Sequence, residues 1–93
     1  MKVEFAIAIV DVDPADKLIQ QLILALRAAR PEYGWVLEGE GWTRPTGGPI
    51  TYVGGIATED RLADVRRAVT ETLSRVDRER RIDLSRLILI ETT

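Results

Sequence analysis

The segment from Tyr33 to Ala57, YGWVLEGEGWTRPTGGPITYVGGIA, constrains the fold more than any other part of this 93-residue chain. Two stretches rich in aromatic and β-branched residues flank a loop that contains prolines and glycines, a pattern typical of a β-hairpin. The segment also holds both tryptophans and both tyrosines of the chain. Because an isolated hairpin is barely stable in water, the flanking residues have to supply the elements against which it packs.

The residues before the hairpin predict a strand followed by a helix. From Val3 to Val10 both alternating sets are mostly apolar, which is typical of a central strand with both faces covered. Asp13 is a suitable N-cap, Pro14 suits the first helical position, and Pro31 ends the helix. The helix has one broad apolar stripe, formed by Leu18, Ile19, Leu22, Ile23, Ala25, Leu26 and Ala29.

The residues after the hairpin predict a second helix and a last strand. Thr58 is the expected N-cap, and the following acids suit the first turn. A narrower apolar stripe follows, made of Leu62, Val65, Val69, Leu73 and Val76. The segment from Leu84 to Ile90 alternates Leu87 and Leu89 with Ile88 and Ile90, which predicts a strand that is again apolar on both faces.

The resulting order is β-α-β-β-α-β, in one domain that spans residues 1–93. Two β-α-β units with right-handed crossovers, joined by a hairpin, predict an α+β fold of the ferredoxin-like kind. In this fold a four-stranded antiparallel sheet, with strand order 4-1-3-2, carries both helices on one face. The Gly54-Gly55 pair within the third strand predicts a bulge or the close approach of another backbone.

The second face of such a sheet has no helices, which predicts an uncovered apolar surface. Val10, Val53 and one alternating pair between Leu87 and Ile90 are expected there. A monomer seldom exposes a contiguous apolar patch beyond a few hundred Å², so we expect a homo-oligomer. The alternative is that Glu4, Glu38 and Thr51 interrupt the patch enough for a monomer.

Composition excludes several kinds of chemistry. The chain has no cysteine and no histidine, so it offers no thiolate, no imidazole base and no Cys/His metal site, and we expect neither a metal nor a cofactor. Only a carboxylate site for a hard cation stays open. The net charge of −2 disfavours nucleic acid and anionic lipid as partners. The sequence has no run of about 20 apolar residues for a membrane span and no signal-peptide pattern, so we expect a cytoplasmic protein.

The hairpin loop is the candidate ligand site. Exposed glycine amides, threonine hydroxyls and an arginine fork can grip phosphate or carboxylate, and a neighbouring indole can anchor an apolar group. The alternative is an ordinary hairpin linker. The candidate residues are Trp42, Thr43, Arg44, Thr46, Gly47 and Gly48.

Other side chains have a structural and a functional interpretation. Asp11 and Asp13 form an acid–base or cation pair, or else a loop residue and an N-cap. Glu38 and Glu40 are catalytic or ligand carboxylates, or else charges that keep an edge strand from pairing. Trp35 and Trp42 lie seven residues apart and fall on opposite strand faces, so one is expected in the core. The basic cluster Arg75, Arg78, Arg80 and Arg81 is interrupted by acids and is expected to be a solvated helix end.

These observations favour a non-enzymatic, homo-oligomeric ferredoxin-like domain with a regulatory or assembly role. It would bind a small anionic ligand or a protein partner through the hairpin of residues 33–57. The alternative is a small cofactor-free enzyme, whose pocket is enclosed at the sheet face of a dimer and whose acid or base is Glu38, Glu40 or Asp11.

Overall fold

The computed structural model describes the backbone of residues 1–43 and 48–92, and within them the side chains of residues 1–37 and 48–91. Its regular elements are β1 (Lys2–Val10), α1 (Lys17–Ala29), β2 (Val36–Thr43), β3 (Pro49–Thr58), α2 (Leu62–Val76) and β4 (Ile88–Thr92). Three short 3₁₀ helices connect them: η1 (Pro31–Tyr33), η2 (Glu59–Arg61) and η3 (Leu84–Arg86).

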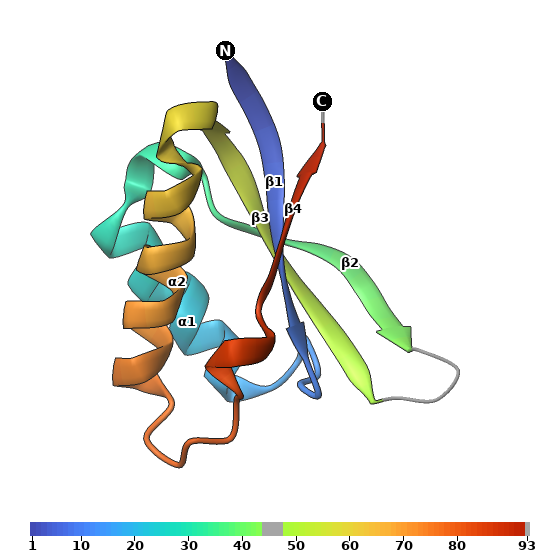
Figure 1. Cartoon of the computed structure of the whole chain (residues 1–93). Coiled ribbons are helices and arrows are strands. Elements are labelled where there is room, and N and C mark those ends of the chain that lie inside the picture. The colour runs from blue at the N-terminus through green and yellow to red at the C-terminus, as the bar shows by residue number, and fades with distance from the viewer. Residues whose placement is uncertain (44–47, 93) are drawn as a thin grey trace.

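The strands form one antiparallel sheet in the order β2-β3-β1-β4. β1 lies inside the sheet, paired with β3 on one side and β4 on the other, as its two apolar faces predicted. Both helices pack on the same side of this sheet, and the C-terminal end of β2 and the N-terminal end of β3 project beyond them (Figure 1). The α+β class, with four antiparallel strands and two helices, is therefore confirmed.

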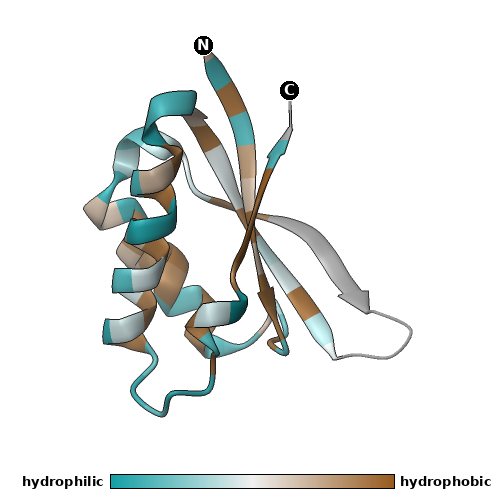
Figure 2. Ribbon diagram, in the orientation of Figure 1, coloured by the Kyte–Doolittle hydropathy of each residue, from teal (hydrophilic) through white to brown (hydrophobic). Residues whose placement is uncertain are grey.

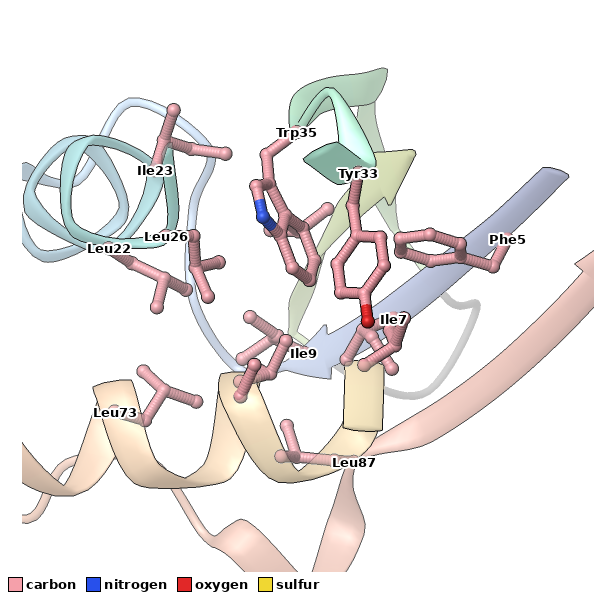
Figure 3. Close-up of a cluster of buried hydrophobic side chains, with 14 of the residues drawn as sticks. Phe5, Ile7, Ile9, Leu22, Ile23, Leu26, Tyr33, Trp35, Leu73 and Leu87 are labelled. Atoms are coloured by element: carbon pink, nitrogen blue, oxygen red, sulfur yellow. The ribbon is translucent and has the colours of Figure 1, made fainter. Parts of the chain in front are cut away.

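The core lies between the helices and the sheet (Figure 3). Phe5, Ile7 and Ile9 of β1 point toward the helices and are at most 1% exposed. The helices contribute the apolar stripes that the sequence predicts; their buried members are Leu18, Ile19, Leu22, Ile23, Leu26, Leu62, Val65, Val69 and Leu73. Ala29, included in the predicted stripe of α1, is instead exposed.

Both helices begin later than the sequence predicts. Asp16, not Asp13, caps α1, because its carboxylate accepts a hydrogen bond from the Leu18 amide at 2.9 Å. Asp13 instead accepts from the Ala15 amide at 2.8 Å and stabilises the turn before the helix. Thr58 precedes η2 without a side-chain capping bond, and α2 starts after this 3₁₀ turn. Asp13 therefore stabilises the turn that precedes α1 rather than the start of this helix, and a 3₁₀ turn separates Thr58 from α2.

The segment before β2 is not a strand, although the predicted hairpin begins at Tyr33. η1 and Gly34, which has a φ of 61°, turn the chain and place both Tyr33 and Trp35 in the core. The Trp35 indole donates a hydrogen bond to the Arg30 carbonyl at 3.0 Å, and the Arg27 guanidinium donates to the Trp35 carbonyl at 3.0 Å. The prediction that one tryptophan is a core residue is thus confirmed for Trp35.

The last predicted strand is shorter than expected. Leu84 to Arg86 form η3, and β4 contains only the end of the predicted segment and two further residues. Leu87 is buried in the core, whereas Ile88 and Ile90 are 43% and 37% exposed. The predicted alternation is therefore correct, but the strand begins four residues later.

Candidate functional site

Most of the predicted ligand loop lies outside what the structure describes. Arg44, Thr46 and Gly47 fall within the gap at residues 44–47. For Trp42 and Thr43 only the backbone is described: Trp42 is opposite Ile50, and Thr43 is opposite Pro49. Gly48 is the candidate whose surroundings are described.

Gly48 lies against Asp11, at the base of the hairpin. A Cβ atom placed on Gly48 would come 3.0 Å from Asp11 Oδ1. The Asp11 amide donates a hydrogen bond to the Pro49 carbonyl at 2.8 Å, and Arg86 Nη1 donates to Asp11 Oδ2 at 3.0 Å. Asp11 has a φ of 63°, a left-handed conformation that aspartate tolerates better than most residues. The turn after β1 and η3 therefore meet at the entry to β3.

The structure does not show the three candidate acids forming one site, because the side chain of Asp11 is described and those of the other two are not. The Asp11 carboxylate is engaged by Arg86, while the side chains of Glu38 and Glu40 lie outside the described part of the chain. The backbone register shifts between Glu38 and Trp42, because four residue steps along β2 lie opposite two steps along β3, from Tyr52 to Ile50. This irregularity was not predicted from the alternation in the sequence.

Apolar residues run along β4 and recur along β1 and β3 (Figure 2), and the strand pairing puts several of them on the sheet face opposite the helices. The register aligns Ala6 with Gly54 and Ile90, and Ala8 with Tyr52 and Ile88, on this face. Large apolar side chains on it are substantially exposed: Val36 at 42%, Ile56 at 48%, Ile88 at 43% and Ile90 at 37%. Figure 1 shows no helix over this face in the described part of the chain. We call this surface, defined by Ala6, Ala8, Val10, Val36, Ile56, Ile88 and Ile90, the open face.

Two of the positions expected on the uncovered surface are now assigned. Val10 does lie on the open face, at the end of β1, and it is partly buried. Val53 does not: it pairs with Ile7 on the helix side and is fully buried. Of the interruptions considered, Glu4 lies on the open face and Thr51 does not, because the buried Thr51 hydroxyl donates to the Val12 carbonyl at 2.8 Å.

A polar cluster surrounds the Tyr33 hydroxyl, at the end of the core away from the Asp11 turn. The Tyr33 hydroxyl donates to Asp64 Oδ2 at 2.6 Å, and Arg30 and Arg67 form ion pairs with the same carboxylate at 3.1 and 3.0 Å. The hydrogen bond from Tyr33, together with those from Arg30 and Arg67, holds the pKa of Asp64 well below its usual range. Burial, and then the bond to Asp64, raises the pKa of the Tyr33 hydroxyl.

This cluster was not predicted from the sequence, because Tyr33 and Asp64 lie 31 residues apart in the chain. Asp64 did carry one signal, since a carboxylate in the first turn of a helix is favoured by the helix dipole. Nothing in the sequence pairs it with Tyr33. Beside the cluster is a groove whose lining includes Lys2, Tyr33, Ile56 and Arg61, and it reaches the open face at Ile56.

Within the described ranges, no group of three or more acidic side chains is arranged to hold a metal ion. No helix in the same ranges is long and apolar enough to cross a membrane. Comparison of the chain with known protein families, with curated proteins and with solved structures finds no match.

Proposed function

We propose that the chain is a ferredoxin-like domain that forms a homo-oligomer through its open face and binds a small ligand or a protein partner through the hairpin of residues 33–57. The observation that carries the proposal is the exposure of Val36, Ile56, Ile88 and Ile90 together on one sheet face. Exposed apolar side chains gathered on one surface mark interaction sites more often than scattered ones do.

The size of the open face fits one subunit of a small dimer. Four strands of 5 to 10 residues, spaced by about 4.8 Å and rising about 3.3 Å per residue, give a flat area of roughly 510 Å². A stable interface removes about 800 Å² from each partner, and side chains enlarge the accessible area above the flat value. An interface of this size needs the whole face, including β2.

A second copy of the chain is the occupant that the charges favour. The charged positions that the strand pairing puts in the open-face register are Lys2 and Glu4 of β1 and Glu38 of β2, one cation and two carboxylates. A mostly apolar face with so few charges can meet a copy of itself with little repulsion. Closed homo-oligomers built on such self-complementary surfaces are the commonest assemblies of soluble proteins.

The hairpin supplies the ligand-binding part of the proposal. The ends of β2 and β3 that lead into the loop project beyond both helices (Figure 1), so we expect the hairpin to be accessible to a ligand or to a neighbouring subunit. Arg44 would hold an anionic group and Trp42 an apolar one, with Thr43, Thr46, Gly47 and Gly48 supplying hydroxyl and amide donors. The alternative of a cofactor-free enzyme gains no support from Asp11, whose carboxylate is paired with Arg86.

The interface is tested by placing a charge on the open face. Ile88→Lys removes roughly 1–2 kcal/mol of apolar burial from each subunit, hence about 2–4 kcal/mol from a two-fold dimer. Dissociation should therefore become at least about 30-fold easier, measured by analytical ultracentrifugation over a dilution series. Leu24→Lys is the matched control, because Leu24 is 66% exposed but lies on α1.

The two variants separate the possible outcomes. Dissociation of Ile88→Lys with an intact Leu24→Lys oligomer supports the open-face interface. An oligomer that only Leu24→Lys disrupts would assign the contact to the helices and contradict the proposal. The ligand site is tested separately: if Trp42→Ala and Arg44→Ala leave both assembly and the Trp fluorescence response to anions unchanged, the hairpin role is wrong.

A further inference from the structure

A cleft lies at one end of the helix pair, where the first turn of α1 meets the last turn of α2 and the connection that follows it. Its volume is about 580 Å³, and the residues that matter here are Asp16, Lys17, Arg75, Asp77, Arg78 and Arg81. The cleft is on the helix layer, so it is separate from the open face (Figure 1). The basic cluster that the sequence predicted to be only a solvated helix end contributes three of these residues.

Two carboxylates at this cleft are already engaged. Asp16 accepts from the Leu18 amide and is paired with the Arg81 guanidinium, whose bond lowers the Asp16 pKa. Asp77 is 4% exposed and accepts from the amides of Arg81 at 3.0 Å and Ile82 at 2.8 Å. Their oxygens are therefore used to hold the helix ends and the connection after α2.

Three basic side chains at the cleft form no ion pair with a described residue. Among the described residues, Lys17, Arg75 and Arg78 form no ion pair within 4.0 Å, and Glu79 is the remaining lining carboxylate. Four cations and three carboxylates give the lining a formal charge of +1, in a chain whose net charge is −2. Arg75 lies in the last turn of α2 and Arg78 in the turn that follows this helix, and both line the same cleft.

The position of Lys17 is the unusual feature. It is the first residue of α1, and the first turn of this helix contains no acidic residue. A cation at a helix N-terminus is disfavoured by the helix dipole, by about 0.3–1 kcal/mol. Arg75, in the last turn of α2, is favoured there without any ligand, but Lys17 is not favoured at the start of α1. An anion held between the two helix ends would offset the cost of Lys17.

We infer that this cleft binds a small phosphate-bearing anion. Guanidinium groups grip phosphate oxygens with paired hydrogen bonds, and an ammonium group on the facing helix would add a third donor. The volume is sufficient for a small molecule rather than a chain, and it lies within the size range of small-molecule sites.

The test uses pyrophosphate as the probe, titrated into the whole protein at constant ionic strength and followed by calorimetry. We expect saturable binding that the double variant Arg75→Gln/Arg78→Gln weakens at least tenfold and that Lys17→Gln also weakens. Arg80→Gln is the matched control, because Arg80 is an exposed arginine of the same segment that does not line the cleft. Circular dichroism checks that each variant folds, which exposed Arg→Gln changes should not prevent.

Three results would overturn the inference. The first is an absence of pyrophosphate binding at millimolar concentration, and the second is an equal loss of affinity in Arg80→Gln, which would indicate diffuse electrostatic attraction. The third is tighter binding of citrate than of pyrophosphate, since it would assign the cleft to carboxylates. None of these depends on assembly through the open face, so this inference and the proposed function can fail separately.

Discussion

Gly55 is the residue where β3 comes closest to the segment that leads into β2. A Cβ atom there would clash with the Tyr33 carbonyl oxygen and lie 2.8 Å from Phe5 Cζ. We expect Gly55→Ala to lower the free energy of unfolding by about 3 kcal/mol, because the clash is with backbone and a packed ring. Urea denaturation measures this change.

Gly34→Ala is the matched control for Gly55→Ala. Gly34 has a positive φ, but a Cβ atom there would meet no atom within 4 Å. Only the left-handed backbone conformation is then unfavourable, by about 1–2 kcal/mol. A Gly55→Ala variant as stable as Gly34→Ala would show that β3 and the Tyr33 backbone are not in close contact.

The ionisation of Asp64 makes the free energy of unfolding depend on pH. Its pKa is lower in the folded than in the unfolded chain, so the unfolded state takes up the proton first as the pH falls. The stabilisation is therefore fully present above pH of about 4 and is lost progressively at lower pH. We expect Asp64→Asn to lower the free energy of unfolding near neutral pH, with the difference from the original protein shrinking toward pH of about 2.

Urea denaturation at several pH values tests this dependence. Tyr33→Phe is the companion variant, because it removes the hydroxyl donor but leaves the Arg30 and Arg67 pairs in place. It should lose about 1 kcal/mol, the usual value of one hydrogen bond. An Asp64→Asn variant whose deficit is the same at pH 7 and pH 2 would contradict the assigned shift.

At the scale of elements, the connection between α2 and β4 depends on Asp77. The buried carboxylate accepts two backbone amides, and Ile82, one of the donors, is itself buried. We expect Asp77→Ala to lower the free energy of unfolding by about 1–3 kcal/mol, since it leaves a buried amide without a partner. Asp77→Asn retains one acceptor oxygen and should lose less; equal losses in the two variants would contradict this role.

Element identity was predictable because apolar periodicity reflects burial. The stripe on α2 predicted that helix and its buried side, and the alternation in β1 predicted a central strand but not which of its faces meets the helices. Element ends were less predictable, because one polar residue can serve several local structures. Asp13 and Asp16 both suit an N-cap, and only the turn geometry decides that Asp16 is used.

The segment around Tyr33 and Trp35 shows a second limit of sequence reasoning. The alternation of Tyr33, Trp35 and Leu37 fits a strand, yet the ring contacts with Phe5 decide the conformation. Phe5 meets Trp35 edge-on at a centroid distance of 5.4 Å and Tyr33 at 6.2 Å. Such tertiary contacts override local strand propensity.

The candidate site was predictable only in part. An uncovered sheet face follows from the order of elements, and Ile88, Ile90 and Val10 lie on it as expected. Val53 was misassigned, because the side of a strand that faces the helices depends on register and not on residue type. The cleft between Lys17 and Arg75 was not predictable, since it requires knowing that the start of α1 meets the end of α2.

At the scale of the whole molecule, the arrangement is asymmetric. One sheet face is closed by two helices and a continuous core, while the other exposes isoleucine and valine side chains. Assembly through that face would bury these side chains and bring two projecting hairpins into one particle. The ligand site and the interface would then be linked, so a ligand that contacts the hairpin should shift the assembly equilibrium.

The most direct test is the molar mass of the unmodified protein in solution, measured by analytical ultracentrifugation from about 1 to 100 μM, across the affinity range of ordinary dimers. Assembly through the open face predicts a mass of at least twice the 10.4 kDa of the chain, falling toward the monomer on dilution. A mass of 10.4 kDa across the whole range would contradict the account, because the open face would then remain uncovered.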